Sequence, residues 1–268
     1  MGVRPVCVAL LSGEGFALHT IQRLKLPKVR PHAHWVCSRF QLQDRVMPTI
    51  LFYFDFTSPI AYVMFHRLPH VLAGLAWQVH YRPVLQVALG LGESELNVPK
   101  QMAAANQPAE SRHDVEALAA HDGLPFRWPV NRAFQSAAWL HMAQASSVHG
   151  QPSRQVCETL LNAIWQTGQD PDDPTVQQQA WQAATALLPS VRDVHQSAVQ
   201  QALAQEIANN VQTARQQGVS ALPSCVLLPA DGAGAAPQVF AGLAGLPALR
   251  EAVRARQDFA AYVPDANI

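Results

Sequence analysis

The sequence is poor in charged residues and has no excess of either sign. Lys, Arg, Asp and Glu together make up 14% of the 268 residues, and the formal net charge at pH 7 is zero. This balance argues against a nucleic-acid partner and against a polybasic membrane surface. No window reaches the roughly 18 uninterrupted apolar residues that a membrane-spanning helix requires. We therefore expect neither a nucleic-acid nor a membrane partner.

Cysteine is also scarce, and no two cysteines are close together. The four are Cys7, Cys37, Cys157 and Cys225. Without Cys-x-x-Cys spacing, neither a zinc knuckle nor a redox dithiol can form locally, and reduced thiols in a cytoplasm are the simplest interpretation. His66 and His70 are four apart, but no third ligand follows at a useful spacing, which disfavours a metal site.

Residues 1–46 differ from the rest of the chain. They contain seven Lys or Arg against two acidic residues and show no sustained periodicity. The apolar run 6–11 is too short for a secretory signal, whose core needs about 7–15 residues. We expect a poorly ordered extension or an upstream extension of the reading frame, with Met47 as the natural start, rather than a functional targeting segment.

The chain is organised around residues 50–62, where a buried strand runs directly into a helix. Apolar and aromatic residues end at Asp55, and a Thr-Ser-Pro turn leads into helically spaced apolar residues. Pro59 suits the first turn of that helix and Ser58 its N-cap. A hydroxyl at this place faces the positive end of the helix, which favours an anion. Taken alone, Ser58 is better explained as a plain helix cap.

The remaining pattern predicts a βαβ unit, a helical region and a second half with two strands. Residues 76–84 alternate as a strand, so the first helix connects two parallel strands. Residues 85–193 are mainly helical, and helical spacing returns over 194–217. A loop ending in Pro223, an apolar strand from Ser224, a strand near 238–240 and a last helix complete the chain.

The segment Phe-Tyr-Phe-Asp-Phe-Thr-Ser-Pro-Ile-Ala-Tyr at residues 52–62 resembles the opening of the 2-hydroxychromene-2-carboxylate isomerases. These are glutathione-using relatives of kappa-class glutathione transferases and DsbA-like oxidoreductases. The resemblance extends from about Met47 to about Arg256. It implies an α/β, thioredoxin-like fold formed by residues 47–84 and 194–256, with a large helical insertion at 85–193 between the βαβ and ββα halves. Residues 257–268 would form a C-terminal tail.

The same resemblance implies the residues of a glutathione site. Ser58 would be catalytic, and the residues that bind glutathione would be Ser58, Pro59, Lys100, Asn131, Leu222 and Pro223. The loop at 218–223 resembles the family's cis-proline loop, so we expect a cis Leu222–Pro223 bond whose neighbouring backbone pairs with a peptide-like ligand. One departure stands out, because relatives usually carry an Asp near Ala244 that holds the γ-glutamyl ammonium group.

By resemblance we expect a cytoplasmic, glutathione-dependent isomerase that converts 2-hydroxychromene-2-carboxylate to trans-o-hydroxybenzylidenepyruvate in aromatic-compound degradation. Ionising most of a thiol at pH 7 requires its pKa to fall by about two units, or ~2.7 kcal/mol, which a serine hydroxyl and a helix N-terminus are able to supply. The alternatives are a kappa-like glutathione transferase acting on another electrophile and a non-catalytic thioredoxin-fold binding protein. A homodimer is expected by analogy only.

Overall fold

The computed structural model describes residues 47–90, 112–147, 150–186, 188, 190–229 and 236–261. The whole N-terminal extension, Lys100 and the last seven residues lie outside the described residues, as do Cys7 and Cys37. The predictions that concern them therefore stay predictions.

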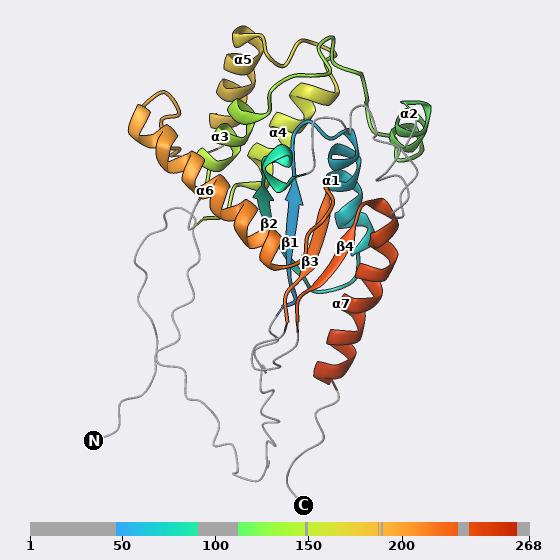
Figure 1. Ribbon diagram of the computed structural model, residues 1–268. Helices are drawn as coiled ribbons and strands as arrows, with labels where there is room; N and C mark the ends of the chain where they lie inside the picture. The colour runs from blue at the N-terminus through green and yellow to red at the C-terminus, as the bar shows by residue number, and fades with distance from the viewer. Residues whose placement is uncertain are drawn as a thin grey trace, which may run out of the picture. The chain divides into compact units, whose positions relative to one another are not determined.

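The described strands form one four-stranded sheet in the order β2-β1-β3-β4 (Figure 1). The strands are β1 (Thr49–Phe54), β2 (Gln78–Pro83), β3 (Ser224–Leu227) and β4 (Gln238–Ala241). β1 is parallel to β2 and antiparallel to β3, which is in turn antiparallel to β4. Since a parallel pair needs a crossover and an antiparallel pair does not, this pairing matches the predicted βαβ and ββα halves.

Seven α-helices and two short 3-10 helices are described. They are α1 (Pro59–Val71), η1 (Gln86–Leu89), α2 (Arg112–His121), α3 (Ala137–Ala145), α4 (Arg154–Trp165), α5 (Pro174–Thr185), α6 (Ser197–Gln216), η3 (Leu243–Gly245) and α7 (Leu246–Ala261). α7 continues past Arg256, where the predicted C-terminal tail begins. Pro174, expected in a loop, is the first residue of α5, because Asp173 caps this helix through the N–H of Thr175.

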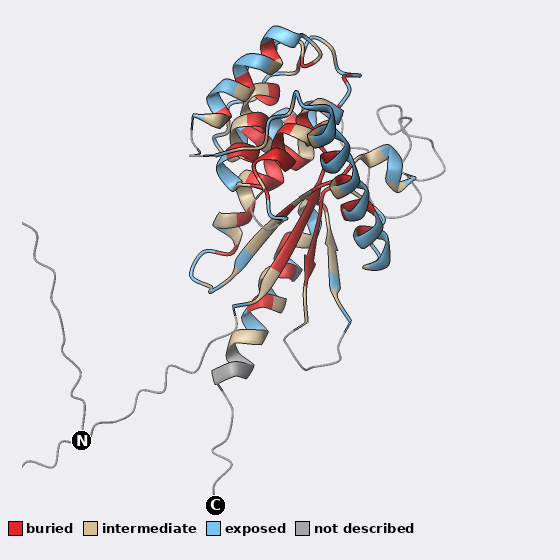
Figure 2. Cartoon of the chain, turned by 90° about the vertical axis from the view of Figure 1, so that its left-hand side faces the viewer, coloured by how far each residue is buried: buried red, intermediate tan, exposed pale blue. Residues whose placement is uncertain are grey.

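Helices cover both faces of the sheet because the side chains of β1 alternate. Phe52 and Phe54 pack in one apolar cluster with side chains of α1, α4 and α7. Leu51 and Tyr53 point to the other face and pack against Val211 and others of α6. All of these side chains in β1 are buried, as the red colour of the central strands shows in Figure 2. A strand covered on both faces explains the continuous apolar run in the sequence.

The helical region and the sheet share one core. The cluster around Phe52 continues through Trp139 of α3 and Leu160 of α4. The indole Nε1 of Trp165 donates to the carbonyl of Phe56 at 3.2 Å, which fixes α4 to the end of β1. The structure thus confirms the predicted thioredoxin-like α/β fold with helices inserted between its two halves.

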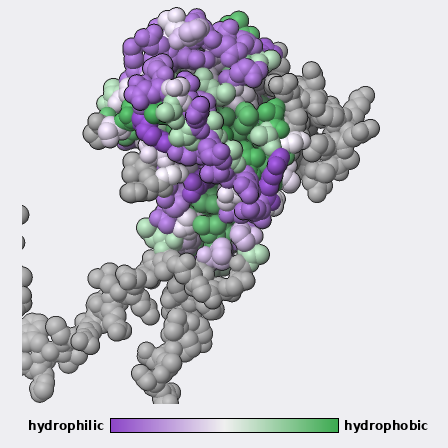
Figure 3. Space-filling view, turned by 60° about the vertical axis from the view of Figure 1, so that its left-hand side comes forward, coloured by the Kyte–Doolittle hydropathy of each residue, from purple (hydrophilic) through white to green (hydrophobic). Residues whose placement is uncertain are grey.

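The surface is consistent with the composition. Hydrophilic side chains cover most of the face shown in Figure 3, with smaller apolar areas between them. Among the described helices, none combines the length and apolar character needed to cross a bilayer.

Candidate functional site

Ser58 is the N-cap of α1, as its position before Pro59 predicts. Its backbone is extended, and its Oγ accepts a hydrogen bond from the N–H of Ala61 at 3.2 Å. Pro59 is the first helical residue, where its missing N–H costs no hydrogen bond. Ser58 is only partly buried. Within the described part of the chain its hydroxyl hydrogen has no acceptor, so the same hydroxyl that caps the helix keeps a proton available for an outside anion.

The electrostatic setting of Ser58 favours negative charge. The first turn of α1 contains no acidic side chain, so the partial positive charge of the helix N-terminus is not neutralised from within the helix. The turn is itself ordered by backbone bonds, since the N–H of Ser58 donates to the carbonyl of Asp55 at 3.3 Å. A preformed donor at a helix N-terminus is suited to a thiolate, a carboxylate or a phosphate.

The pairing of β1, β2 and β3 places the loop that contains Pro223 at the same end of the sheet as Ser58. β1 and β2 both end here, and the register pairs Tyr53 with Ser224, the first residue of β3. Pro223 therefore lies opposite the end of β1. The Leu222–Pro223 peptide bond is cis, which confirms the expectation from the resemblance. Ser58 thus lies at the same end of the sheet as Leu222 and Pro223, although they are far apart in the sequence.

The backbone of Leu222 is suited to an extended ligand. Leu222 is partly exposed, and neither its N–H nor its C=O forms a hydrogen bond with another described residue. Its neighbours are fixed: the Ser224 hydroxyl donates to the carbonyl of Ala221 at 2.7 Å, and the N–H of Gly242 donates to the carbonyl of Pro223 at 2.8 Å. A rigid loop with a free donor and acceptor can pair with a peptide backbone as an added strand does.

The Gly242 bond also places η3 beside the proline loop. Ala244 lies in η3 and is exposed. A carboxylate at this position would lie near the loop of Pro223. The Ala found where relatives carry an Asp therefore leaves this position without a charge. The described residues at this end of the sheet thus offer the hydroxyl of Ser58 and the unpaired backbone N–H and C=O of Leu222, and they carry no charge at position 244.

Asp55 also lies at this end of the sheet, and the sequence analysis did not identify it as part of the site. It is 1% exposed, and its carboxylate accepts from the N–H of Thr57 at 3.1 Å and from the N–H of Gln86 at 2.7 Å. The side chain of Ser136, at the start of α3, also hydrogen bonds to it. Burial raises the pKa of the Asp55 carboxyl, although these hydrogen bonds oppose the shift. One carboxylate therefore ties together the turn before α1, the segment after β2 and the helical region.

Asn131 has structural partners in the helical region. Its Nδ2 donates to Asp172 at 2.8 Å, and its Oδ1 accepts from the N–H of Ala133 at 3.1 Å. Asp172 in turn accepts from the N–H of Gln135 at 3.0 Å. The Nδ2 group thus joins two loops of the helical region, and Oδ1 closes a turn within its own loop, which is typical of Asn. Its assignment to a glutathione site stays a prediction, as does that of Lys100.

The described cysteines lie too deep for thiol chemistry. Cys157 and Cys225 are both fully buried and free, and burial raises the pKa of each thiol. Cys225 is the small core residue that the sequence predicts. In the described ranges no group of three or more His, Cys, Asp and Glu is arranged to hold a metal ion. His66 instead contacts Asn162, with Nε2 and Oδ1 3.2 Å apart.

Comparison with solved structures places this fold among thioredoxin-like proteins. A 2-hydroxychromene-2-carboxylate isomerase superposes with a TM-score of 0.53 and 20% sequence identity, covering 80% of this chain and 100% of that one. A protein described as a probable DsbA oxidoreductase from Streptomyces coelicolor gives a TM-score of 0.53 and 16% identity, covering 82% of this chain and 94% of that one. At these identities the likeness concerns the fold alone. No curated protein matches the sequence.

The family is established by the sequence itself. Residues 49–254 match the family model described as the DsbA-like thioredoxin domain, a span that begins with β1 and ends within α7. The match includes both landmarks of the candidate site, the Ser-Pro turn and the cis-proline loop. The chain therefore belongs to the DsbA-like thioredoxin domain family.

Proposed function

We propose that the protein is a glutathione-dependent isomerase that converts 2-hydroxychromene-2-carboxylate to trans-o-hydroxybenzylidenepyruvate in the cytoplasm. The observation that carries this proposal is the partly exposed Ser58 hydroxyl, which caps α1 and lies at the same sheet edge as the cis Leu222–Pro223 bond. This site has an oxygen where a disulfide oxidoreductase needs a sulfur. A role in thiol–disulfide exchange is thus disfavoured, because Ser58 cannot form a mixed disulfide.

In this proposal the protein binds and activates glutathione without being modified. Glutathione supplies a sulfur nucleophile that adds to the conjugated substrate. The ring C–O bond breaks to give the phenol and the keto group, the chain rotates about the bond that the addition made single, and the sulfur then leaves, so glutathione is returned unchanged. Ser58 donates its free hydroxyl hydrogen to the sulfur, and the N-terminus of α1 favours the thiolate over the thiol. The free N–H and C=O of Leu222 pair with the backbone of the tripeptide.

The alternative enzyme is a kappa-like glutathione transferase that acts on another electrophile, whereas the exposed Ala244 supports a non-catalytic binding protein on the same scaffold. With Ala rather than a carboxylate at position 244, a charge-assisted hydrogen bond of about 1.5–3 kcal/mol is missing. Weak glutathione binding would suit a protein with another thiol or peptide ligand. The substrate in the first candidate is a small aromatic carboxylate, and a homodimer remains part of the proposal by analogy.

The test follows the absorbance of 2-hydroxychromene-2-carboxylate with and without glutathione, using the wild type and Ser58→Ala. Conversion that requires glutathione and is lost in Ser58→Ala supports the isomerase. Glutathione binding without conversion favours a transferase, which a panel of other electrophiles would then identify. Calorimetry that shows no glutathione binding would eliminate both enzyme functions and leave the binding protein.

A further inference from the structure

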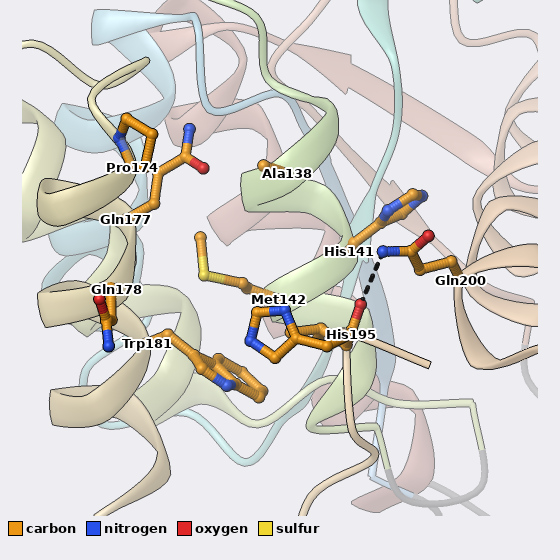
Figure 4. Close-up of a pocket in the computed structure, with 10 residues that line it drawn as sticks. Ala138, His141, Met142, Pro174, Gln177, Gln178, Trp181, His195 and Gln200 are labelled. Carbon is orange, nitrogen blue, oxygen red and sulfur yellow. Dashed lines mark hydrogen bonds between the residues drawn. The ribbon is translucent and has the colours of Figure 1, made fainter. Parts of the chain in front are cut away.

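A cavity lies in the helical region, and Ser58 does not line it. Its volume is about 500 Å³, and it is lined by α3, by the first half of α5 and by residues 194–200, which lead into α6 (Figure 4). A cavity of this size falls within the range of sites for small organic ligands, about 300–1,000 Å³. No residue of the candidate glutathione site lines it. A role for this cavity thus stands independently of the proposed isomerase activity.

Apolar and aromatic side chains form one part of the lining. Met142 is buried, and the indole of Trp181 and the methyl group of Ala138 are partly exposed. In Figure 4 the Trp181 ring reaches from α5 toward α3, near the imidazole of His195. An indole face and a thioether offer favourable contacts to a flat ring, since aromatic rings stack on one another and sulfur packs well against aromatic edges.

Histidine and glutamine side chains form most of the rest of the lining. The imidazoles of His141 and His195 form no hydrogen bond with any other residue in the described ranges. Two glutamine amides are held by their nitrogens, because Gln177 donates to the carbonyl of Pro171 at 2.8 Å and Gln200 to the carbonyl of Val194 at 2.9 Å. Their carbonyl oxygens are left as acceptors. The lining therefore offers hydrogen-bond acceptors to a ligand that carries an O–H or N–H group.

The charges around the cavity disfavour an anion. None of the ten lining residues is Lys, Arg, Asp or Glu. Asp173 precedes Pro174 at one edge, and Asp193 precedes Val194 at another. The nearby Arg192 is neutralised by Glu206, to which it donates at 2.5 and 2.9 Å. Burial lowers the pKa of His141, which keeps this imidazole neutral at pH 7. The two exposed carboxylates offset the positive N-terminal ends of α5 and α6 beside them, so no net positive charge is left to attract an anion.

We propose that this cavity binds an uncharged, flat aromatic compound that carries a hydroxyl or amino group, with the ring against Trp181 and Met142 and the polar group toward the histidines and glutamines. The ligand class differs from the aromatic carboxylate proposed for the Ser58 site. In this proposal the cavity is a binding site separate from the Ser58 site, and it takes aromatic compounds that carry no carboxylate.

The experiment is calorimetric titration of the full chain with 2-naphthol, 2-naphthoate and the saturated alcohol decahydro-2-naphthol. We expect 2-naphthol to bind with one-to-one stoichiometry, and the other two to bind at least about tenfold more weakly, a difference of about 1.4 kcal/mol. Equal binding of 2-naphthoate would overturn the charge argument, and equal binding of the saturated alcohol would overturn the aromatic one. Absence of 2-naphthol binding would overturn the site.

Two adjacent substitutions locate the binding. Ala138→Phe fills the cavity from α3, whereas Ala137→Phe places the same side chain at the neighbouring exposed position. We expect Ala138→Phe to abolish 2-naphthol binding, while Ala137→Phe and Ser58→Ala bind as the wild type does. Circular dichroism and thermal unfolding check that both Phe variants are folded. Binding retained in a folded Ala138→Phe, or lost in Ser58→Ala, would contradict the assignment.

Discussion

The carboxylate of Asp55 accepts a hydrogen bond of 2.7 Å from the backbone N–H of Gln86, and so joins the end of β1 to the segment that follows β2. Its other oxygen accepts from the N–H of Thr57, two residues before the helix that Pro59 begins. The turn that contains Ser58 is therefore stabilised by the buried Asp55 carboxylate, which accepts hydrogen bonds from two backbone N–H groups.

Asp55→Asn should destabilise the protein, because an amide has one acceptor oxygen and its NH₂ group would face a backbone N–H. We expect a loss of about 1–3 kcal/mol in the free energy of unfolding, measured by urea denaturation. Asp193→Asn is the matched control. Asp193 also accepts a backbone N–H but is exposed, so the variant should unfold close to the wild type. A midpoint for Asp55→Asn equal to that of the wild type would contradict the buried network.

Ser58→Asp should separate the capping role of Ser58 from its proposed role toward sulfur. Asp caps helices as well as Ser does, so stability should be kept, whereas Ser58→Ala should lose about 1 kcal/mol. A carboxylate next to the ligand would instead repel a thiolate. We expect Ser58→Asp to show wild-type thermal unfolding without glutathione-dependent conversion, and Ser58→Thr to keep both. Activity in Ser58→Asp would show that a hydroxyl donor is not needed.

Ala244→Asp should strengthen glutathione binding. The exposed position in η3, joined to the loop of Pro223 through Gly242, allows a carboxylate to reach an ammonium group of the ligand. A charge-assisted hydrogen bond of about 1.5 kcal/mol or more corresponds to roughly a tenfold lower dissociation constant. Calorimetry measures the change, with Ala244→Asn as the uncharged control. An unchanged affinity would place the γ-glutamyl group elsewhere.

The buried thiols should not react in the folded protein. In a variant with Cys7→Ser and Cys37→Ser, only Cys157 and Cys225 remain, both with a raised pKa and no solvent exposure. We expect no reaction with Ellman's reagent until denaturant is added, and then two equivalents. Rapid labelling of the native variant would indicate an accessible thiol and reopen a redox function.

His66→Gln should weaken the dependence of stability on pH. Burial lowers the pKa of His66 below 6.5 in the folded state, so the unfolded chain binds the proton first as the pH falls. The contribution of neutral His66 is present above 6.5 and is lost as the pH falls toward the folded pKa. Unfolding at about pH 7.5 and about pH 5.5, on either side of 6.5, should show a smaller loss for His66→Gln than for the wild type. An equal loss would mean that other groups cause it.

Local patterns in the sequence were enough to predict the strand before Asp55, the helix that begins at Pro59 and the strand after Pro223, and the structure confirms all three. The thioredoxin-like fold and the cis Leu222–Pro223 bond were predicted from the family resemblance, and the structure confirms them too. The role of Asp55 was missed because it depends on Gln86 and Ser136, which are distant in the sequence. The one signal was a carboxylate at the end of a fully apolar strand, a place where a charge is costly unless it has partners.

The cavity could not be predicted from the sequence either. Its lining comes from three helical segments whose spacing depends on how α3, α5 and α6 pack. Periodicity identifies which side of each helix is apolar, but not where two apolar sides fail to close.

The order of the strands has a consequence for how the molecule is made. β1 is synthesised early, yet its antiparallel neighbour β3 follows only after the whole helical region. Until then one edge of β1 has no partner, and an unpaired apolar edge invites aggregation. A nascent chain that ends before β3 should thus need protection by chaperones, and the proposed glutathione site would be complete only after Leu222 and Pro223 have left the ribosome.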